Sequence, residues 1–302
     1  MTLLDKALVG MLPLVPRRVV QLFSSRYIAG PSIASAVETV RTLNGAGKLA
    51  TIDVLGEEIT HEREAQAITQ AYLDVLAAIE REGLDSGVSV KPTALGLDLE
   101  YALCREHLEL ITREAARSET FVRIDMEGSP TTSETLELYR DLRGRGFDNV
   151  GIVLQAYLRR TFDDLRALSE LRPNVRLCKG IYIEPESRAF TDPEAVRANF
   201  VRLLDALLDG GGYVAVATHD EWLIGETLRR VGGMDKDAYE LQMLLGVREQ
   251  RATELVHEGH RLRVYVPYGE SWYEYSLRRL QENPAMAGTI ARSTVGRPFR
   301  RG

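Results

Sequence analysis

Residues 150–180 read VGIVLQAYLRRTFDDLRALSELRPNVRLCKG. The short apolar run Val150–Gln155 predicts a strand, Phe162–Leu171 has the spacing of an amphipathic helix, and Val175–Lys179 predicts a second strand. A strand, a helix and a strand in this order form a βαβ unit with parallel strands. Both predicted strands end in a polar side chain, which bears on where a functional site lies.

The same alternation extends over most of the chain. The other predicted strands are Thr51–Leu55, Val88–Lys91, Phe121–Asp125, Tyr213–Thr218, Tyr239–Met243 and Leu262–Val266. The other predicted helices are His61–Glu82, Leu97–Arg117, Ser133–Gly144, Pro193–Leu208, Glu221–Arg230, Arg248–Glu258 and Ser271–Gln281. Eight strands in strict alternation with helices favour an α/β fold of the (β/α)8, or TIM, barrel type. An open doubly wound sheet is the alternative, but such sheets more often divide into two halves.

The chain therefore divides into three predicted parts. Residues 1–45 form a helical lead-in, residues 46–284 the catalytic barrel, and residues 285–302 a C-terminal tail. The uncharged run Ala7–Pro16 is too short to cross a bilayer, which takes about 20 apolar residues. A short amphipathic helix packed on the barrel is the simpler interpretation of this run, and a weak membrane-surface role is the alternative.

Composition excludes several classes of function. The 302 residues include 38 Lys and Arg against 44 Asp and Glu, so the net charge of −6 offers no basic footprint for nucleic acid. Hydrophobic residues make up 44%, as expected of a soluble globular protein. Cys104 and Cys178 are far apart and have no metal-ligand spacing, so we expect no metal site and no disulfide scaffold. A reducing cytoplasm is the expected location.

Polar residues follow the predicted strands at their carboxyl ends. They are Asp53 and Glu57, Lys91, Asp125, Gln155, Lys179, Thr218 to Asp220, Gln242 and Tyr265. In a barrel these ends meet at one mouth, where such enzymes carry their active sites. The beginnings of the strands show no comparable polar set, so the pattern predicts a single site at the carboxyl-terminal face.

Single residues in this set allow more than one interpretation. A lysine at a strand end is as often part of a structural ion pair as a functional group. Adjacent Arg278 and Arg279 suggest a fork for a carboxylate or phosphate, although Arg278 and Glu282 also have the spacing of a helix salt bridge. Without further information, an aldolase-type barrel with Lys91 or Lys179 as Schiff-base nucleophile and a non-enzymatic barrel that binds a carboxylate ligand both stay open.

Eight strings of residues, taken together, resemble proline dehydrogenase in its short, monofunctional bacterial form. They are DVLGE from Asp53, SVKPT from Ser89, RIDME from Arg123, LQAYL from Leu154, RLCKG from Arg176, ATHD from Ala217, LQML from Leu241, and YVPYG from Tyr265 leading to RRLQEN from Arg278. They occur in order from about residue 50 to residue 284 and fall at the same face of the predicted barrel.

The resemblance implies a distorted (β/α)8 barrel with a final helix over its carboxyl-terminal mouth. It further implies non-covalently bound FAD, oxidation of L-proline to Δ1-pyrroline-5-carboxylate by hydride transfer to flavin N5, and transfer of the electrons to a membrane quinone. This reaction is the first step of proline catabolism to glutamate. The implied partners are L-proline, the quinone, a downstream pyrroline-5-carboxylate dehydrogenase and, through weak peripheral contact, the cytoplasmic face of the membrane.

The resemblance also assigns site residues. Those implied for substrate binding are Lys91, Arg278, Arg279, Tyr265, Leu244 and the gate carboxylate Glu57. Those implied for the cofactor are Met126, Gln155, Arg176, Lys179, Gly180, Ile181, Thr218, His219, Gln242 and Glu282. Asp125 and Arg176 are the implied catalytic residues; a carboxylate among arginines stays ionised, so we assign Asp125 an electrostatic role rather than that of a general base. Ile181 and Ile183 depart from the residues common in the family at these positions.

Overall fold

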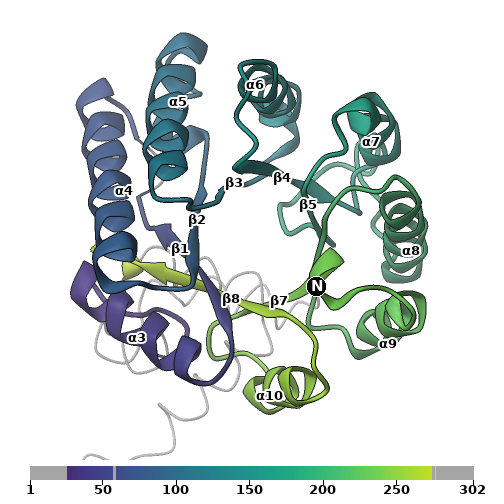
Figure 1. Cartoon of the computed structure of the whole chain (residues 1–302). Coiled ribbons are helices and arrows are strands. Elements are labelled where there is room, and N and C mark those ends of the chain that lie inside the picture. Colours follow the sequence, from purple (N-terminus) through teal and green to yellow (C-terminus); the bar gives the residue numbers. More distant parts are fainter. Residues whose placement is uncertain (1–25, 57–58, 274–275, 277–302) are drawn as a thin grey trace, which may run out of the picture.

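Eight parallel strands close into a barrel that is surrounded by helices (Figure 1). The computed structural model describes residues 26–56, 59–273 and 276. Each strand pairs in parallel with the next in sequence, and β8 closes the barrel by pairing with β1, where Thr51 lies opposite Tyr265. The predicted (β/α)8 barrel is confirmed, and the open doubly wound sheet is excluded.

The boundaries of the elements follow the predicted ones closely. The strands are β1 (Leu49–Val54), β2 (Ser86–Val90), β3 (Val122–Ile124), β4 (Val150–Gln155), β5 (Val175–Cys178), β6 (Val214–Ala217), β7 (Tyr239–Leu244) and β8 (Leu262–Tyr268). The helices are α3 (Ile33–Gly45), α4 (Glu62–Glu82), α5 (Tyr101–Arg117), α6 (Thr132–Gly144), α7 (Thr161–Leu168), α8 (Pro193–Asp209), α9 (Glu221–Val231) and α10 (Glu249–His257). The largest difference is at α5, which begins after its predicted start at Leu97 because a 3-10 turn, Thr93–Leu95, precedes it.

Local sequence explains where α8 begins. The carboxylate of Asp192 accepts a hydrogen bond from the backbone N–H of Ala195 at 2.9 Å, and Pro193 occupies the first helical position. Such a cap satisfies a backbone donor that the helix itself leaves free, and proline lacks the N–H that would have no partner there. The loop between β5 and α8 therefore ends at a defined point, beside the mouth of the barrel.

Helix α3 completes the ring of helices. It precedes β1 in sequence and packs against β1, β8 and α4, so it covers the part of the sheet where the barrel closes (Figure 1). In a regular barrel, the helix after the last strand fills this place. Of the predicted final helix Ser271–Gln281, only residues 271–273 and 276 are described, and the tail 285–302 lies outside the described residues. Within the described residues, no helix is both long enough and apolar enough to cross a membrane.

The two faces of the sheet carry different side chains. On β3, Val122 and Ile124 point toward the helices and are buried in the main hydrophobic core, whereas Arg123 and Asp125 point toward the barrel axis. Glycine makes room for this polar interior: a Cβ on Gly151 would collide with Arg123 Nη1 and with the backbone oxygen of Asn174.

The expectation that the beginnings of the strands lack polar residues is therefore wrong. The second residues of β3, β7 and β8 are Arg123, Glu240 and Arg263. Arg123 and Glu240 are buried, and the Arg263 side chain is mostly buried. Because each of these side chains alternates with apolar neighbours, it faces the barrel interior and not the helices. The polar interior thus extends below the mouth of the barrel.

Candidate active site

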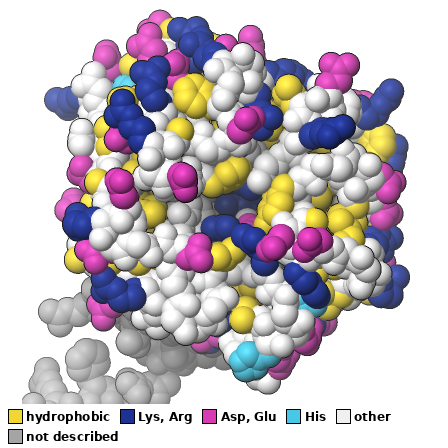
Figure 2. Space-filling view, viewed as in Figure 1, with side chains coloured by type: hydrophobic (Ala, Val, Ile, Leu, Met, Phe, Trp, Pro, Cys, Tyr) yellow, Lys and Arg dark blue, Asp and Glu magenta, His cyan; other side chains and the backbone are white. Residues whose placement is uncertain are grey.

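A cavity of about 680 Å³ opens at the carboxyl ends of the strands. Figure 2 shows the hollow at the centre of this face, with basic side chains inside it and hydrophobic ones along its walls. The cavity is lined by Lys91, Asp125, Met126, Val153, Gln155, Arg176, Cys178, Lys179, Gly180, Ile181, Tyr182, Arg197, Ala217, Thr218, His219, Asp220, Gln242, Met243, Leu244 and Tyr265. Its size is that of a site for a small organic ligand or part of a larger cofactor.

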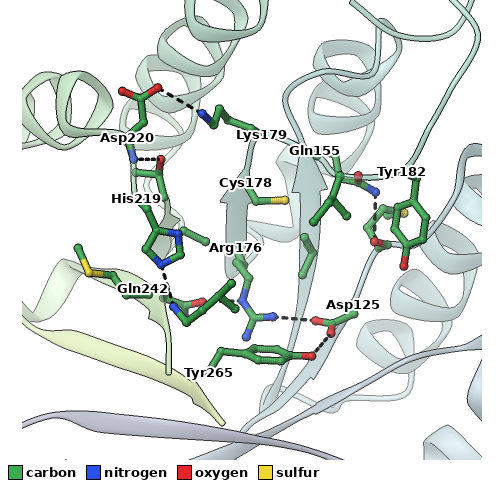
Figure 3. A pocket seen from close by; sticks show the side chains of 18 of the residues that line it. Asp125, Gln155, Arg176, Cys178, Lys179, Tyr182, His219, Asp220, Gln242 and Tyr265 are labelled. Carbon is green, nitrogen blue, oxygen red and sulfur yellow. Dashed lines mark hydrogen bonds and ion pairs between the residues drawn. The ribbon is translucent and has the colours of Figure 1, made fainter. Parts of the chain in front are cut away.

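Asp125 collects three hydrogen bonds on one side of the cavity (Figure 3). Its Oδ1 accepts from Arg176 Nη1 at 2.7 Å and from Ser89 Oγ at 2.8 Å, and its Oδ2 accepts from the Tyr265 hydroxyl at 2.9 Å. Both oxygens of the carboxylate are occupied and a guanidinium lies against one of them, so the group acts here as a fixed negative charge.

Lys91 forms the second ion pair of the interior. Its Nζ lies 2.7 and 2.8 Å from the two carboxylate oxygens of Asp53, which is fully buried, and donates to the Tyr265 hydroxyl at 3.2 Å. It also lies 3.9 Å from Asp125 Oδ2. A lysine this deeply buried keeps its charge only with a paired carboxylate, which Asp53 supplies.

The guanidinium of Arg176 is held at two of its three nitrogens. Nε donates to the Gln242 side-chain oxygen at 2.5 Å, and Nη1 donates to Asp125 and, at 3.0 Å, to Ser89. The group also lies 5.3 Å from the centre of the Tyr265 ring. Among the residues that the structure describes, none accepts a hydrogen bond from Nη2. Arg176 therefore presents a fixed cation with donors left for a ligand.

Gln155 supplies an unused acceptor in the cavity. Its Nε2 donates to the backbone oxygens of Met126 and Glu127, at 3.1 and 2.8 Å, which sets the direction of the amide. Its Oε1 is buried and has no hydrogen-bond partner among the described residues. A buried polar atom without a partner is costly, so this acceptor suits a bound group that carries an N–H or O–H.

The loop after β5 passes close to the cavity wall at Gly180. The backbone there has φ of +107°, and a Cβ would overlap the ring of Tyr157. Only glycine fits this position without strain. Close approach of the backbone leaves its polar groups accessible along the wall of the cavity.

His219 lies in the cavity as a neutral imidazole. Its Nε2 accepts a hydrogen bond from the backbone N–H of Leu244 at 3.0 Å, so Nδ1 carries the proton. Burial lowers the pKa of His219 to about 4, and the charges of Arg248 and Lys179 add to that effect. His219 is therefore a hydrogen-bond donor of fixed tautomer and is not a general acid at neutral pH.

The opposite end of the cavity from Asp125 carries a third ion-pair cluster (Figure 3). Asp220 accepts from Lys179 Nζ at 3.2 Å and from Arg197 Nε at 2.9 Å. Burial alone would raise the pKa of Asp220, but its hydrogen bonds with the two cations hold it below the usual value. Arg197 also donates to Glu194 at 2.6 Å, so the cluster joins two cations to two carboxylates, and its cationic N–H groups are donors of the kind that bind an anionic group.

The chemistry of the lining is that of an organic cofactor or substrate site. Within the described ranges, no group of three or more His, Cys, Asp or Glu side chains could hold a metal ion. Burial raises the pKa of Cys178 to about 11, so its thiol is protonated and a poor nucleophile. The cavity offers a bound molecule charged groups and hydrogen-bond donors in fixed positions, together with an apolar wall.

Comparison with known sequences gives the family. A sequence model described as proline dehydrogenase matches residues 36–292. Proline dehydrogenase 1 of Bacillus subtilis (strain 168) is 41% identical over 277 residues, or 91% of each chain. Proline dehydrogenase of Deinococcus radiodurans is 37% identical over 278 residues, or 90% of each chain. The chain belongs to the proline dehydrogenase family.

Solved structures agree with this family and fold. The barrel superimposes with a TM-score of 0.80 on proline utilization A (PutA) from Bdellovibrio bacteriovorus inactivated by N-propargylglycine, at 27% identity. The match covers 86% of this chain and 32% of that longer chain. The resemblance inferred from the eight strings of residues is thus confirmed at the level of family and fold.

The structure brings most of the residues predicted from family resemblance into the one cavity. Thirteen of them line it: Lys91, Asp125, Met126, Gln155, Arg176, Lys179, Gly180, Ile181, Thr218, His219, Gln242, Leu244 and Tyr265. Glu57, Arg278, Arg279 and Glu282 lie outside the described residues. Of the two departures from the family, Ile181 lines the cavity, whereas Ile183 is fully exposed and does not.

Sequence reasoning missed several residues of this site. Tyr182 and Arg197 line the cavity but lie beyond the strand ends, in the loop after β5 and on α8. No feature of the sequence distinguishes Arg197 from an ordinary solvent-exposed arginine on a helix. Tyr182 follows Lys179 by three residues, so its nearness to a predicted strand end was the available signal.

Proposed function

We propose that this protein oxidises L-proline to Δ1-pyrroline-5-carboxylate, with non-covalently bound FAD as its redox cofactor and a membrane quinone as electron acceptor. Family membership supports the proline dehydrogenase activity. The single observation that carries the finer proposal is the cavity at the strand ends, where thirteen residues implied for substrate and cofactor meet. The flavin, when bound, supplies the hydride-accepting chemistry that amino acid side chains lack.

The donors and acceptors of the cavity fit a flavin. The buried Gln155 Oε1, which has no partner within the described part of the chain, matches a ring N–H, and Arg176 and His219 offer N–H groups to ring acceptors. Lys179 and Arg197 bring cationic N–H donors to the other end of the cavity, which suits a pyrophosphate. We assign FAD contacts to these residues and to the wall formed by Met126, Gly180, Ile181, Thr218 and Gln242.

The substrate carboxylate is assigned to the cationic side of the site. Lys91 faces the cavity with its charge held by Asp53 beneath it, and Arg278 and Arg279 are the further donors implied by family resemblance. Family resemblance implies that Glu57 is a gate carboxylate that would pair with Arg278. Tyr265 and Leu244 provide surface for the proline ring. Clamping the carboxylate fixes the rest of the small ring relative to the cofactor.

Asp125 has an electrostatic function in this proposal. Its oxygens already accept from Arg176, Ser89 and Tyr265, which leaves it as a fixed negative charge beside the substrate amine. The amine must lose its proton before hydride departs, so we expect activity to rise with pH. Arg176, in turn, places a cation where negative charge develops during reduction.

The Schiff-base alternative is disfavoured by the state of the lysines. A nucleophilic lysine must be neutral, whereas Lys91 lies 2.7 Å from the carboxylate of Asp53 and Lys179 lies 3.2 Å from that of Asp220. No observation in the described structure favours a covalent lysine mechanism over the redox one.

Purified protein tests the proposal in two steps. Heat denaturation should release a yellow cofactor that co-migrates with FAD, because no covalent link is proposed. Incubation with L-proline and a soluble quinone analogue should then form a product that o-aminobenzaldehyde traps as a coloured adduct. A protein that neither contains nor takes up FAD would refute the cofactor. A flavoprotein that forms no adduct would refute the substrate.

A further inference from the structure

Below the floor of the cavity lies a buried carboxylate that the proposed mechanism has not used. Glu240 is on the inner face of β7, two residues before Gln242, and is 2% exposed. Its oxygens accept hydrogen bonds from Arg263 Nε at 2.8 and 3.1 Å, from the Tyr213 hydroxyl at 3.1 Å, and from the side-chain amide of Gln242. It is therefore one layer below the residues that face a ligand.

Gln242 links Glu240 to Arg176 through two hydrogen bonds, and the charge of Glu240 sets which end of the Gln242 amide faces each partner. An ionised carboxylate only accepts, so Gln242 must turn its NH₂ group toward Glu240. Its oxygen then points to Arg176 Nε, at 2.5 Å. If the amide of Gln242 were reversed, its oxygen would face the carboxylate of Glu240 and its NH₂ group would face the Nε–H of Arg176. Neither pair could form a hydrogen bond, so both contacts would be lost.

Glu240 is ionised and firmly anchored. Burial alone would raise its pKa, but the charge and hydrogen bond of Arg263, with help from Gln242 and Arg123, hold the pKa below the usual value. Arg263 in turn donates to the backbone oxygen of Ala50 on β1 at 2.7 Å. The carboxylate is thus fixed to the part of the sheet where the barrel closes.

We propose that Glu240 is a positioning residue for the reaction proposed above, and that it acts on Arg176 through Gln242. Asp125 and Ser89 hold Nη1 of Arg176, while the Gln242 oxygen holds Nε. With two corners fixed, the plane of the guanidinium and the direction of Nη2 are fixed as well. The inference rests on the proposed function, because it places the held cation beside a bound flavin.

The test measures the flavin midpoint potential of the FAD-loaded protein by titration with dithionite, without proline. Glu240→Gln should lower the potential because the amide of Gln242 is no longer oriented and Arg176 no longer stabilises reduced flavin from a fixed position. We expect a tenfold change in the oxidised-to-reduced equilibrium, about 30 mV for a two-electron couple. Gln242→Leu, which leaves the Glu240–Arg263 pair intact, should lower it at least as much, because Gln242 also belongs to the proposed flavin wall.

The matched control is Tyr213→Phe. It removes another hydrogen bond to Glu240 but leaves the bonds to Gln242 and Arg263, so the potential should equal that of the wild type. The double variant E240Q/Q242L should show no further shift beyond Q242L, because both changes interrupt one path.

Three results would overturn the inference: a wild-type potential in E240Q, a wild-type potential in Q242L, or additive shifts in the double variant. If E240Q does not fold, Glu240→Asp replaces it, since the shorter side chain keeps the negative charge near Arg263 and withdraws the acceptor oxygen from Gln242. Failure of the proposed function is distinguishable, because the titration needs no proline. Loaded protein that shows the expected shifts but is not reduced by proline contradicts the substrate and leaves the role of Glu240 supported.

Discussion

The outer and inner faces of the barrel sheet are built for different purposes. On the outer face, Ile152 and Leu241 are essentially fully buried and pack against the helices as parts of one apolar core. On the inner face, charges are paired across strands, as Asp53 with Lys91, Asp125 with Arg176, and Glu240 with Arg263. The first arrangement stabilises a fold by removing apolar surface from water.

The inner arrangement is a weak source of stability. Burial of two charges costs hydration that their attraction only partly offsets, and apolar residues of similar volume often serve stability as well or better. Barrel interiors are commonly filled by branched apolar side chains. A charged interior that opens on a cavity therefore indicates selection for binding and chemistry, and the two faces should respond differently to substitution.

The largest expected effect on stability is at the outer face. Ile152→Ala should lower the free energy of unfolding by about 2–5 kcal/mol, because it leaves a hole in a closely packed core. Chemical denaturation measures this loss. The exposed Leu110, at 41% exposure, provides the control, and Leu110→Ala should change stability by less than about 0.5 kcal/mol. If Ile152→Ala folded but had greatly reduced turnover per bound FAD, the outer face would also contribute to function, which would contradict the division between the two faces.

Asp125→Ala should give the largest effect on turnover at the inner face. It removes the acceptor of Arg176, Ser89 and Tyr265 together, so we expect about a 100-fold lower kcat with FAD content near that of the wild type. Steady-state kinetics normalised to bound flavin provides the measurement. Asp125→Asn keeps an acceptor oxygen but removes the negative charge, so it separates the contribution of the charge from that of the hydrogen bonds. Near wild-type turnover in Asp125→Ala would remove the electrostatic role.

A smaller effect is expected from Tyr265→Phe. The hydroxyl lies between Lys91, at 3.2 Å, and Asp125, at 2.9 Å, whereas the ring also stacks near Arg176. Loss of the hydroxyl alone should reduce kcat/KM for proline by about tenfold, which is the cost of one hydrogen bond to a charged group. If Tyr265→Phe and Tyr265→Ala proved equally impaired, the hydroxyl rather than the ring would carry the whole contribution.

The smallest effect is a pH dependence of stability from His219. The folded state keeps this imidazole neutral down to a pKa of about 4, while the unfolded chain binds a proton below about 6.5. Between these values the unfolded state binds more protons, so this group makes stability fall as the pH falls. His219→Gln should therefore lose fewer degrees of Tm than the wild type between pH 7 and pH 5.

Thermal unfolding at both pH values checks this prediction. His257→Gln, at an exposed site near the end of α10, is the control and should behave like the wild type. An unchanged pH dependence in His219→Gln would mean that the imidazole is not held neutral by burial.

Sequence patterns predicted the polar residues at the carboxyl ends of the strands and missed those near the amino ends, inside the barrel. Period-two alternation and helix spacing were enough for the barrel, and the rule that barrel sites lie at strand ends led to Asp125 and Gln155. The same rule directed attention away from Glu240, which is the second residue of β7 and lies far from its carboxyl end. Its inward direction was implicit in the alternation with Leu241, but its partners Arg263 and Tyr213 come from neighbouring strands and appear only when the sheet closes.

The most direct test of the central claim is the visible spectrum of the purified protein under anaerobic conditions before and after addition of L-proline. We expect the protein to show flavin bands at about 380 and 450 nm that bleach with proline and return when a quinone is added. Bands that persist in the presence of proline would contradict the assignment of the substrate. A colourless protein that does not take up added FAD would contradict the account of the cavity as a flavin site.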